Sequence, residues 1–167
     1  LSTYPLVTHY GNDEAKAAGR TYLGILLTTS VLFLLMAILW TWNLTGTLEF
    51  KLGGILAGKA EGPAVAMLLA LYAFGTGKAA LMPFHRWLPA AMVAPTPVSA
   101  LLHAVAIVKA GVFTVLKVIV YIFGISFLDD TGASTWLMYA AAFTLLCSSV
   151  IALTKDNLKA RLAYSTI

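Results

Sequence analysis

The stretch that decides the fold runs from Gly75 to Phe113 and reads GTGKAALMPFHRWLPAAMVAPTPVSALLHAVAIVKAGVF. Its apolar segments are punctuated by Gly and Pro, yet they contain Lys78, His103 and Lys109. A charged side chain at the centre of a bilayer costs about 2.5–3.5 kcal/mol on insertion scales, so such residues mark functional sites. The rest of the sequence has to show whether these segments lie in a membrane.

The composition is that of a membrane protein. Of the 167 residues, 60% are hydrophobic and 11% are charged, whereas a soluble domain carries about a quarter charged residues. Neither Thr21–Leu48 nor Thr131–Thr154 contains Asp, Glu, Lys or Arg. Each run exceeds the roughly 20 residues that a helix needs to cross about 30 Å of hydrocarbon. The sequence therefore predicts an all-α, polytopic membrane helix bundle and excludes an ordinary soluble domain.

We expect about four transmembrane helices, one of them broken, and the start of a fifth helix. The expected bounds are about 22–42, 64–94 (the broken helix), 98–124 and 136–153, with a partial helix from 157. The chain starts without Met and stops within the apolar phrase ARLAYSTI, so we expect residues 1–167 to be an internal fragment of one transmembrane domain. Tryptophans near the ends of the first and fourth spans fit the aromatic belts of membrane interfaces.

Basic residues in the connections are distributed unevenly between the two sides of the predicted bundle. The positive-inside rule places the side that is richer in Lys and Arg in the cytoplasm. Two basic residues, Lys51 and Lys59, lie on one side. The side predicted to be cytoplasmic holds Lys16, Arg20, Arg86, Lys155, Lys159 and Arg161.

The three ionisable residues of the opening stretch lie deep in their predicted spans. At 1.5 Å per residue, Lys109 is about 16 Å along a helix that begins at Val98, and His103 is about 8 Å along it. Lys78 follows about 14 residues of the second span, or about 21 Å of helix. Burial disfavours the charged form of a lysine, and histidine titrates near physiological pH. We favour a proton relay through these residues over purely structural ion pairs.

The backbone around Lys78 supports a transport function. Gly75, Gly77 and Pro83 are predicted to break the second span, because glycine loosens a helix and proline removes a hydrogen bond. Irregular backbone at membrane depth is tolerated where it is buried in protein or lines a polar cavity, and broken spans beside ionisable groups are typical of transporters. Lys117 and His85 are supporting candidates, although Lys117 can also extend to the far surface.

Other chemistry receives no support from the sequence. The lone Cys147 cannot form an intramolecular disulfide framework or a thiolate metal cluster, and we interpret it as a packing residue. No flavin, iron–sulfur or nicotinamide motif is present, so we expect no cofactor, no bound metal and no catalytic residue in this chain. No basic patch suggests a nucleic-acid partner.

The run KAALMPFHRWLPAAMVAPTPVSALLHAVAIVKAGVF resembles the proton-translocating antiporter-like membrane subunits. This family contains large subunits of Mrp-type sodium/proton antiporters and homologous membrane subunits of respiratory complex I. The opening STYPLVTHYGNDEAKAAGRTYL and the closing DNLKARLAYSTI are also similar to it, so the resemblance covers nearly the whole chain. It implies that the four spans are the sixth to ninth of about fourteen transmembrane helices. Helices are the structure in which such a chain crosses lipid. The resemblance also implies a multi-pass protein of the bacterial inner membrane with other subunits, protons and sodium as partners.

The resemblance also implies roles for individual residues. Lys78 matches the essential lysine of the family's broken seventh span, and His103 matches its eighth-span histidine. Lys109 matches the eighth-span lysine of D-type antiporter subunits, and the phrases WLPAAM and APTP favour the same subtype. The family pairs the Lys78 position with a glutamate on the fifth span, which we expect before Leu1 and outside this chain.

Three functions remain as hypotheses. The first is a proton-translocating subunit of a multi-subunit sodium/proton antiporter, a transporter without catalysis of its own. The second is an antiporter-like proton-pumping membrane subunit of an NADH:quinone oxidoreductase (complex I) or a related hydrogenase. The third is a scaffold subunit whose buried lysines form only ion pairs. Neighbouring genes would separate the first two, as small antiporter subunits or as redox subunits with cysteine clusters.

Overall fold

The computed structural model describes residues 3–102 and 107–167, and these residues form helices, turns and loops with no strand. Up to residue 102 the elements are α1 (Tyr4–Val7), α2 (Asp13–Thr28), the π-helical η1 (Thr29–Leu34), α3 (Leu35–Thr45), α4 (Gly62–Gly75), the 3-10 turn η2 (Gly77–Ala79), α5 (Trp87–Ala91) and α6 (Thr96–Ala100). From residue 107 they are α7 (Ile107–Lys117), the π-helical η4 (Val118–Phe123), α8 (Ile125–Thr131), α9 (Thr135–Leu153) and α10 (Leu158–Thr166).

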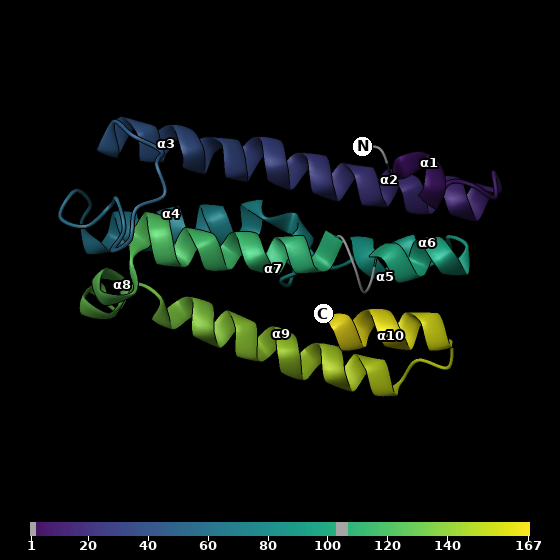
Figure 1. The fold of residues 1–167 in the computed structure, drawn as a ribbon. Coiled ribbons are helices and arrows are strands. Elements are labelled where there is room, and N and C mark those ends of the chain that lie inside the picture. Colours follow the sequence, from purple (N-terminus) through teal and green to yellow (C-terminus); the bar gives the residue numbers. More distant parts are fainter. Residues whose placement is uncertain (1–2, 103–106) are drawn as a thin grey trace.

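The helices run roughly side by side as an elongated bundle (Figure 1). The rod formed by α2, η1 and α3 lies along one side, α7 and α4 occupy the middle, and α9 with α10 lies along the other side. Contacts between α4 and η1, α2 and α5, and α10 and α5 join these layers, while α7 contacts η2 within the middle layer and α9 contacts α10 within the last one. The end of α3 and all of α8 lie at one end of the bundle, whereas α1, α6 and the start of α10 lie at the other.

The first long helix is longer than the expected span of 22–42, because it runs over 33 residues from Asp13 to Thr45. Asn12 caps its start, with the side-chain oxygen accepting a hydrogen bond from the Ala15 amide at 2.8 Å. Asp13 and Glu14 then occupy the first turn, where negative charge is favourable beside the positive end of the helix dipole. The connection before the predicted span is therefore already helical.

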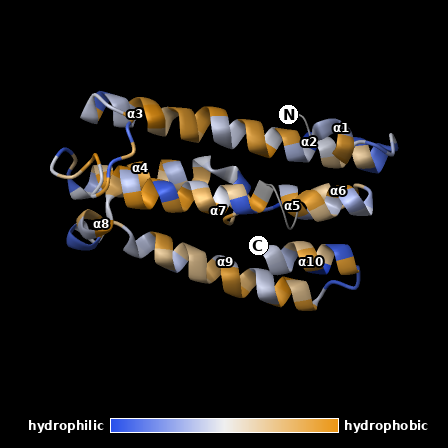
Figure 2. Cartoon of the chain, viewed as in Figure 1, coloured by the Kyte–Doolittle hydropathy of each residue, from blue (hydrophilic) through white to orange (hydrophobic). Residues whose placement is uncertain are grey.

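The chain is a multi-pass membrane protein by the length and apolar character of its helices. In the described part, Asp13–Thr45 and Thr135–Leu153 are each long and apolar enough to cross a membrane. Val108–Phe123 and Ile125–Thr131 form a third span if the pair, bent by 76°, is taken as one. Apolar side chains such as Leu146 (65% exposed) and Leu153 (82% exposed) face outward, as lipid contact requires. Figure 2, coloured by hydropathy, shows hydrophobic residues along most of the length of the helices.

Asp129 and Asp130 lie in the short helix α8, which is not among the helices expected from the sequence. The chain bends at Gly124, whose φ of 84° is in the left-handed region that favours glycine. Gly54, also at positive φ, lies against the backbone of Phe123 and Gly124. The amides of Ile55 and Leu56 both donate to the Ile122 carbonyl, at 2.9 and 3.1 Å. The loop that follows α3 is thereby fixed to the end of η4.

Two hydrophobic clusters lie on either side of the break in the second span. One contains Tyr72 of α4 together with Phe123 and Leu128 from the bent third span. The other contains Ala80 and Trp87 and reaches α2 and α10. The segment between Tyr72 and Ala80 therefore connects two packed regions and has a fixed place between them.

Candidate functional site

The second span is broken where α4 ends at Gly75. Thr76 leaves the helical conformation, with φ −81° and ψ 62°, and its hydroxyl donates to the Tyr72 carbonyl at 2.9 Å. The short turn η2 follows and closes with a bond from the Ala80 amide to the Gly77 carbonyl at 3.1 Å. Ala80 has a φ of 55°, in the left-handed region. Such a conformation is uncommon for a residue with a side chain, so the surroundings must hold it in place.

Glycines let neighbouring backbones approach the break closely. A Cβ on Gly75 would lie 2.6 Å from the amide nitrogen of Leu34 in η1, and one on Gly77 would meet the side chain of Thr29. On the opposite side, a Cβ on Gly111 of α7 would lie 2.5 Å from Ala79 N. The break is therefore packed between the π-helical part of the first span and α7. Small residues serve the same purpose wherever membrane helices pack closely.

Two hydrogen bonds from other elements hold the broken segment. The indole N–H of Trp87 donates to the Gly77 carbonyl at 2.9 Å, and Trp87 is fully buried. The Met82 amide donates to the hydroxyl oxygen of Thr144 on α9 at 3.3 Å. The Met82 amide thereby gains a partner, and the Gly77 carbonyl, which also accepts from the Ala80 amide, gains a second one. Backbone groups at membrane depth need such partners.

Lys78 lies on η2 and Lys109 lies on α7, and both side chains are exposed at the surface of this chain. The two elements are in direct contact, because Gly111, two residues beyond Lys109, abuts the backbone of Lys78. Among the described residues the one ion pair is between Glu49 and Lys51, at 3.3 Å in an exposed loop. His103, the third residue of the predicted proton relay, lies outside the described residues.

No acidic partner for Lys78 is found in the described chain. The carboxylates all lie in connections or near helix ends: Asp13, Glu14, Glu49, Glu61, Asp129, Asp130 and Asp156. The glutamate that the resemblance implies stays a prediction about residues outside this sequence.

The two supporting candidates have different surroundings. The Lys117 ammonium lies 4.6 Å from the ring centre of Phe50, 5.7 Å from that of Phe113 and 5.9 Å from that of Tyr121. Its side chain thus reaches the loop after α3 and makes cation–π contacts there. The His85 ring lies 6.2 Å from the ring of Tyr164 on α10, and its Nδ1 is buried without a hydrogen-bond partner among the described residues.

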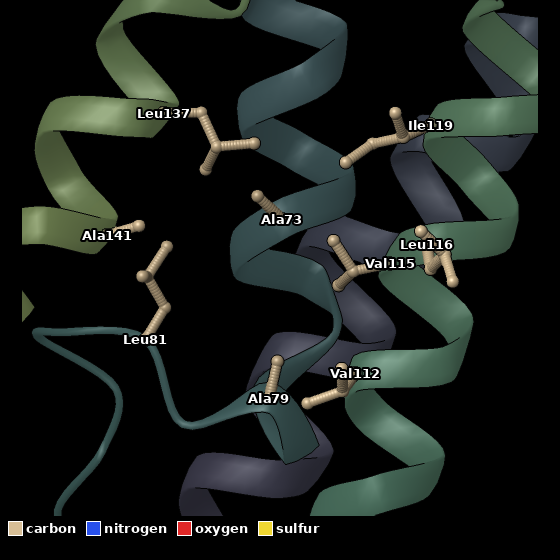
Figure 3. A pocket seen from close by; sticks show the side chains of 9 residues that line it. All are labelled: Ala73, Ala79, Leu81, Val112, Val115, Leu116, Ile119, Leu137 and Ala141. Atoms are coloured by element: carbon tan, nitrogen blue, oxygen red, sulfur yellow. The ribbon is translucent and has the colours of Figure 1, made fainter. Parts of the chain in front are cut away.

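An apolar groove of about 310 Å³ lies next to the break. Figure 3 shows its walls, formed by Val112, Val115, Leu116 and Ile119 on one side and by Leu81 together with Leu137 and Ala141 of α9 on the other, with Ala73 and Ala79 between them. All nine lining residues are apolar, and none offers a hydroxyl or an amide side chain. A proton path needs polar groups or ordered water, so this groove does not serve as one.

Charged residues gather at the ends of the bundle. Lys59 reaches back to the Thr45 carbonyl at 3.0 Å at one end. At the other end Lys159 donates to the Ala94 carbonyl at 3.1 Å, and Arg161 donates to the Lys155 carbonyl at 2.9 Å. The polar colours in Figure 2 are concentrated at these two ends. The described residues contain no group of His, Cys, Asp or Glu that could hold a metal ion, and Cys147 is a free, half-buried thiol.

Three residues that hold the break were missed in the sequence. Thr29 and Thr144 are buried hydroxyls within apolar spans, and Trp87 is a buried indole. The hydroxyl of Thr29 donates to the Ile25 carbonyl at 2.9 Å, as hydroxyls on helices often do. The sequence does not distinguish a hydroxyl that also contacts another span from one that bonds only a carbonyl of its own helix.

Comparison with known proteins identifies a family of transmembrane proteins to which this chain is similar. The whole chain, residues 1–167, matches the family described as NADH:quinone oxidoreductase/Mrp antiporter, TM. It is 38% identical over 141 residues to NAD(P)H-quinone oxidoreductase chain 5 of Synechocystis sp., an alignment that covers 80% of this chain and 20% of that protein. It is 34% identical over 173 residues to a Staphylococcus aureus protein named as antiporter subunit mnhA2, covering 100% of this chain and 20% of that protein.

The chain thus spans about a fifth of the length of the curated relatives it matches. One relative is named as an antiporter subunit and the other as a quinone oxidoreductase chain, so both branches that the sequence left open are represented. The D-type subtype stays a prediction. The family match over the full chain, joined with the broken apolar span, establishes that this chain belongs to the NADH:quinone oxidoreductase/Mrp antiporter transmembrane family.

Proposed function

We propose that this chain is part of the proton-translocating subunit of a multi-subunit sodium/proton antiporter. Protons move through Lys78, His103 and Lys109, with water or hydroxyl groups between them. The observation that carries the proposal is the helix break that places Lys78 on irregular backbone within a bundle of apolar helices. Backbone of that kind in a membrane is tolerated where it is buried in protein or lines a polar cavity, and broken spans beside ionisable groups are typical of transporters.

The packing of the break brings the two elements that carry the lysines into contact. Lys78 lies on η2, and η2 packs against α7, which carries Lys109. Gly111 brings the two backbones together without an intervening side chain. On α7, Lys109 and Gly111 are about 3 Å apart along the helix axis and about 200° apart around it, so a proton that passes between the two amines needs water or hydroxyl groups. Neither of them makes an ion pair among the described residues, which leaves both amines open to proton exchange.

The membrane placement follows the charge distribution. We propose a multi-pass protein of the bacterial inner membrane in which the end that carries Lys155, Lys159 and Arg161 faces the cytoplasm. Its partners are the other subunits of the complex and the lipid bilayer. Protons and sodium are the transported ions.

The test uses the full-length subunit in its complex, in everted membrane vesicles with a fluorescent pH probe. Lys78→Ala and Lys109→Ala should each abolish sodium-dependent proton movement, while the complex is present at normal amounts. Lys51→Ala is the matched control, because Lys51 is an exposed loop lysine paired with Glu49. Normal transport in both span variants would leave only the scaffold hypothesis, in which the lysines have a structural function.

A second candidate is a proton-pumping membrane subunit of an NADH:quinone oxidoreductase or a related hydrogenase, and the relative in Synechocystis sp. favours it. The same vesicles separate the two candidates. Proton movement on addition of sodium alone supports the antiporter, whereas movement that requires an electron donor and a quinone supports the second candidate. Both candidates predict loss of proton movement in the lysine variants.

A further inference from the structure

The broken segment is held by two hydrogen bonds that come from outside it. A helix that stops inside the membrane leaves its last carbonyls and the next amides without intrahelical partners. At the start of the segment the Gly77 carbonyl accepts from Trp87 at 2.9 Å, and towards its end the Met82 amide donates to Thr144 at 3.3 Å. Lys78 lies between these two points.

The Thr144 hydroxyl makes two hydrogen bonds at once. It donates to the Ala140 carbonyl of its own helix at 2.8 Å, which directs its lone pairs towards the Met82 amide. The residue is buried, with 4% of its surface exposed. Water therefore has little access to replace the hydroxyl if it is removed, and the Met82 amide would stay without a partner.

Trp87 holds the other end of the segment with a rigid side chain. Its ring is fully buried and meets the Tyr22 ring of α2 edge-to-face, with the ring centres 5.8 Å apart. The indole N–H can only donate a hydrogen bond, and it donates to the Gly77 carbonyl. The bond ties Lys78 to the packed cluster that includes α5.

We propose that Trp87 and Thr144 are positioning residues, which set the place of Lys78 relative to α7 by holding the two ends of the broken segment. This inference rests on the proposed function and extends it to two residues that touch no transported ion. Thr144 lies on α9, so the proton site of the broken span depends on a hydroxyl from a different span. Removal of either bond lets the segment shift and displaces Lys78, although the Lys78 side chain itself is still present.

The test compares variants that lose one hydrogen-bonding group with controls that make the same or a similar change elsewhere. Thr144→Val removes the hydroxyl and keeps the shape, whereas Thr144→Ser keeps the hydroxyl. Ser148→Ala is the control on the same buried face, because the Ser148 hydroxyl bonds only its own helix, to the Leu145 carbonyl. Trp87→Phe removes the indole N–H that bonds Gly77. Trp136→Phe is its control, because the Trp136 indole N–H has no hydrogen-bond partner among the described residues.

The measurement is proton movement in everted vesicles as a function of pH, normalised to the amount of assembled complex. Thr144→Val and Trp87→Phe should lower the rate by about fivefold to tenfold, the effect of one buried hydrogen bond left unmade. They should also move the pH of half-maximal rate, because Lys78 is displaced from its neighbours. Thr144→Ser and both controls should stay near the wild-type profile.

Other titratable groups on the elements that contact η2 are unchanged in these variants. The elements are α7, α2 and α4, together with η1 and α5, which meet Gly77 through Thr29 and Trp87 and carry no titratable residue. Their described titratable or charged residues are Lys109, Lys117, Asp13, Glu14, Lys16, Arg20, Tyr22 and Tyr72. A shifted profile therefore reports a changed environment of Lys78 and not the loss of one of these groups.

The outcomes separate this inference from the proposed function. If Thr144→Val and Trp87→Phe match their controls while Lys78→Ala is inactive, the inference is overturned and the proposed function stands. A rate that falls only in proportion to assembled complex, with an unmoved pH profile, also overturns it, as does a Thr144→Ser variant as impaired as Thr144→Val. If Lys78→Ala is active, both fall. Should Trp87→Phe fail to assemble, the Val and Ser variants of Thr144 decide alone.

Discussion

Gly111 of α7 lies against the backbone of Lys78, so closely that a Cβ on Gly111 would be 2.5 Å from the Lys78 carbonyl carbon. The same Cβ would be 2.5 Å from the amide nitrogen of Ala79. Real Cβ atoms do not approach backbone atoms to this distance, so α7 can pack on the break only with glycine here. The contact joins the element that carries Lys78 to the helix that carries Lys109.

Gly111→Ala is therefore predicted to separate α7 from the break. Overpacking of a tight contact costs typically about 1–3 kcal/mol, and we expect a lower thermal stability of the purified complex together with reduced proton movement. Gly24→Ala is the matched control, since Gly24 is also a helical glycine but has no atom within 4 Å of a Cβ. Equal stability of the two variants would show that the contact between α7 and η2 is not tight.

The loop after α3 offers a second matched pair. Gly54 and Gly58 both have positive φ, 85° and 73°, but a Cβ on Gly54 would meet the Phe123 carbonyl whereas one on Gly58 would meet nothing. Both Ala variants carry the backbone strain of roughly 1–2 kcal/mol that a left-handed residue imposes. Gly54→Ala should lower the thermal unfolding temperature further than Gly58→Ala does. The same decrease in both would mean that the loop does not pack on the bend at Gly124.

Lys117 is predicted to hold the same loop through cation–π contacts. Its ammonium lies 4.6 Å from the Phe50 ring centre, and such contacts are worth about 0.5–2 kcal/mol. Lys117→Met keeps the apolar stem and removes the charge, so amides of residues 46–61 should exchange hydrogen faster. Lys117→Arg keeps the cation and should stay close to the wild type. Unchanged exchange in Lys117→Met would contradict the contact.

The orientation of the bundle is testable by labelling. In a variant without native cysteines, Asp156→Cys is predicted to face the cytoplasm and Lys51→Cys the opposite side. A membrane-impermeant maleimide added to intact cells should therefore label position 51 and spare position 156, and lysed cells should label both. The reverse pattern would invert the proposed topology.

The sequence predicted the helical membrane fold because composition alone decides it. Two runs without charge, each longer than a bilayer needs, leave no alternative to spanning helices. The bounds were less predictable. The first helix starts at Asp13 because Asn12 caps it, whereas the apolar signal begins only near Tyr22. The bend at Gly124 and helix α8 were missed, because they depend on contact with Gly54 and Ile55 of a distant loop.

Lys78 and Lys109 could be singled out because charge is rare in this sequence and expensive in lipid. The residues that hold the break could not. Thr144 lies 62 positions from its partner Met82, and its hydroxyl resembles others, such as that of Thr114, that bond only their own helix. Its contact with the Met82 amide depends on where α9 lies relative to the broken span, which no local pattern encodes.

Proton flux in proteoliposomes tests the central claim most directly. The purified full-length complex is reconstituted with an internal pH dye, a sodium gradient is imposed, and the initial rate is compared between Lys78→Ala and the loop control Lys51→Ala. The proposed relay predicts that flux falls to the level of empty liposomes in Lys78→Ala and stays at the wild-type rate in Lys51→Ala. Equal flux in the two variants, at equal amounts of reconstituted complex, would contradict a proton path through Lys78.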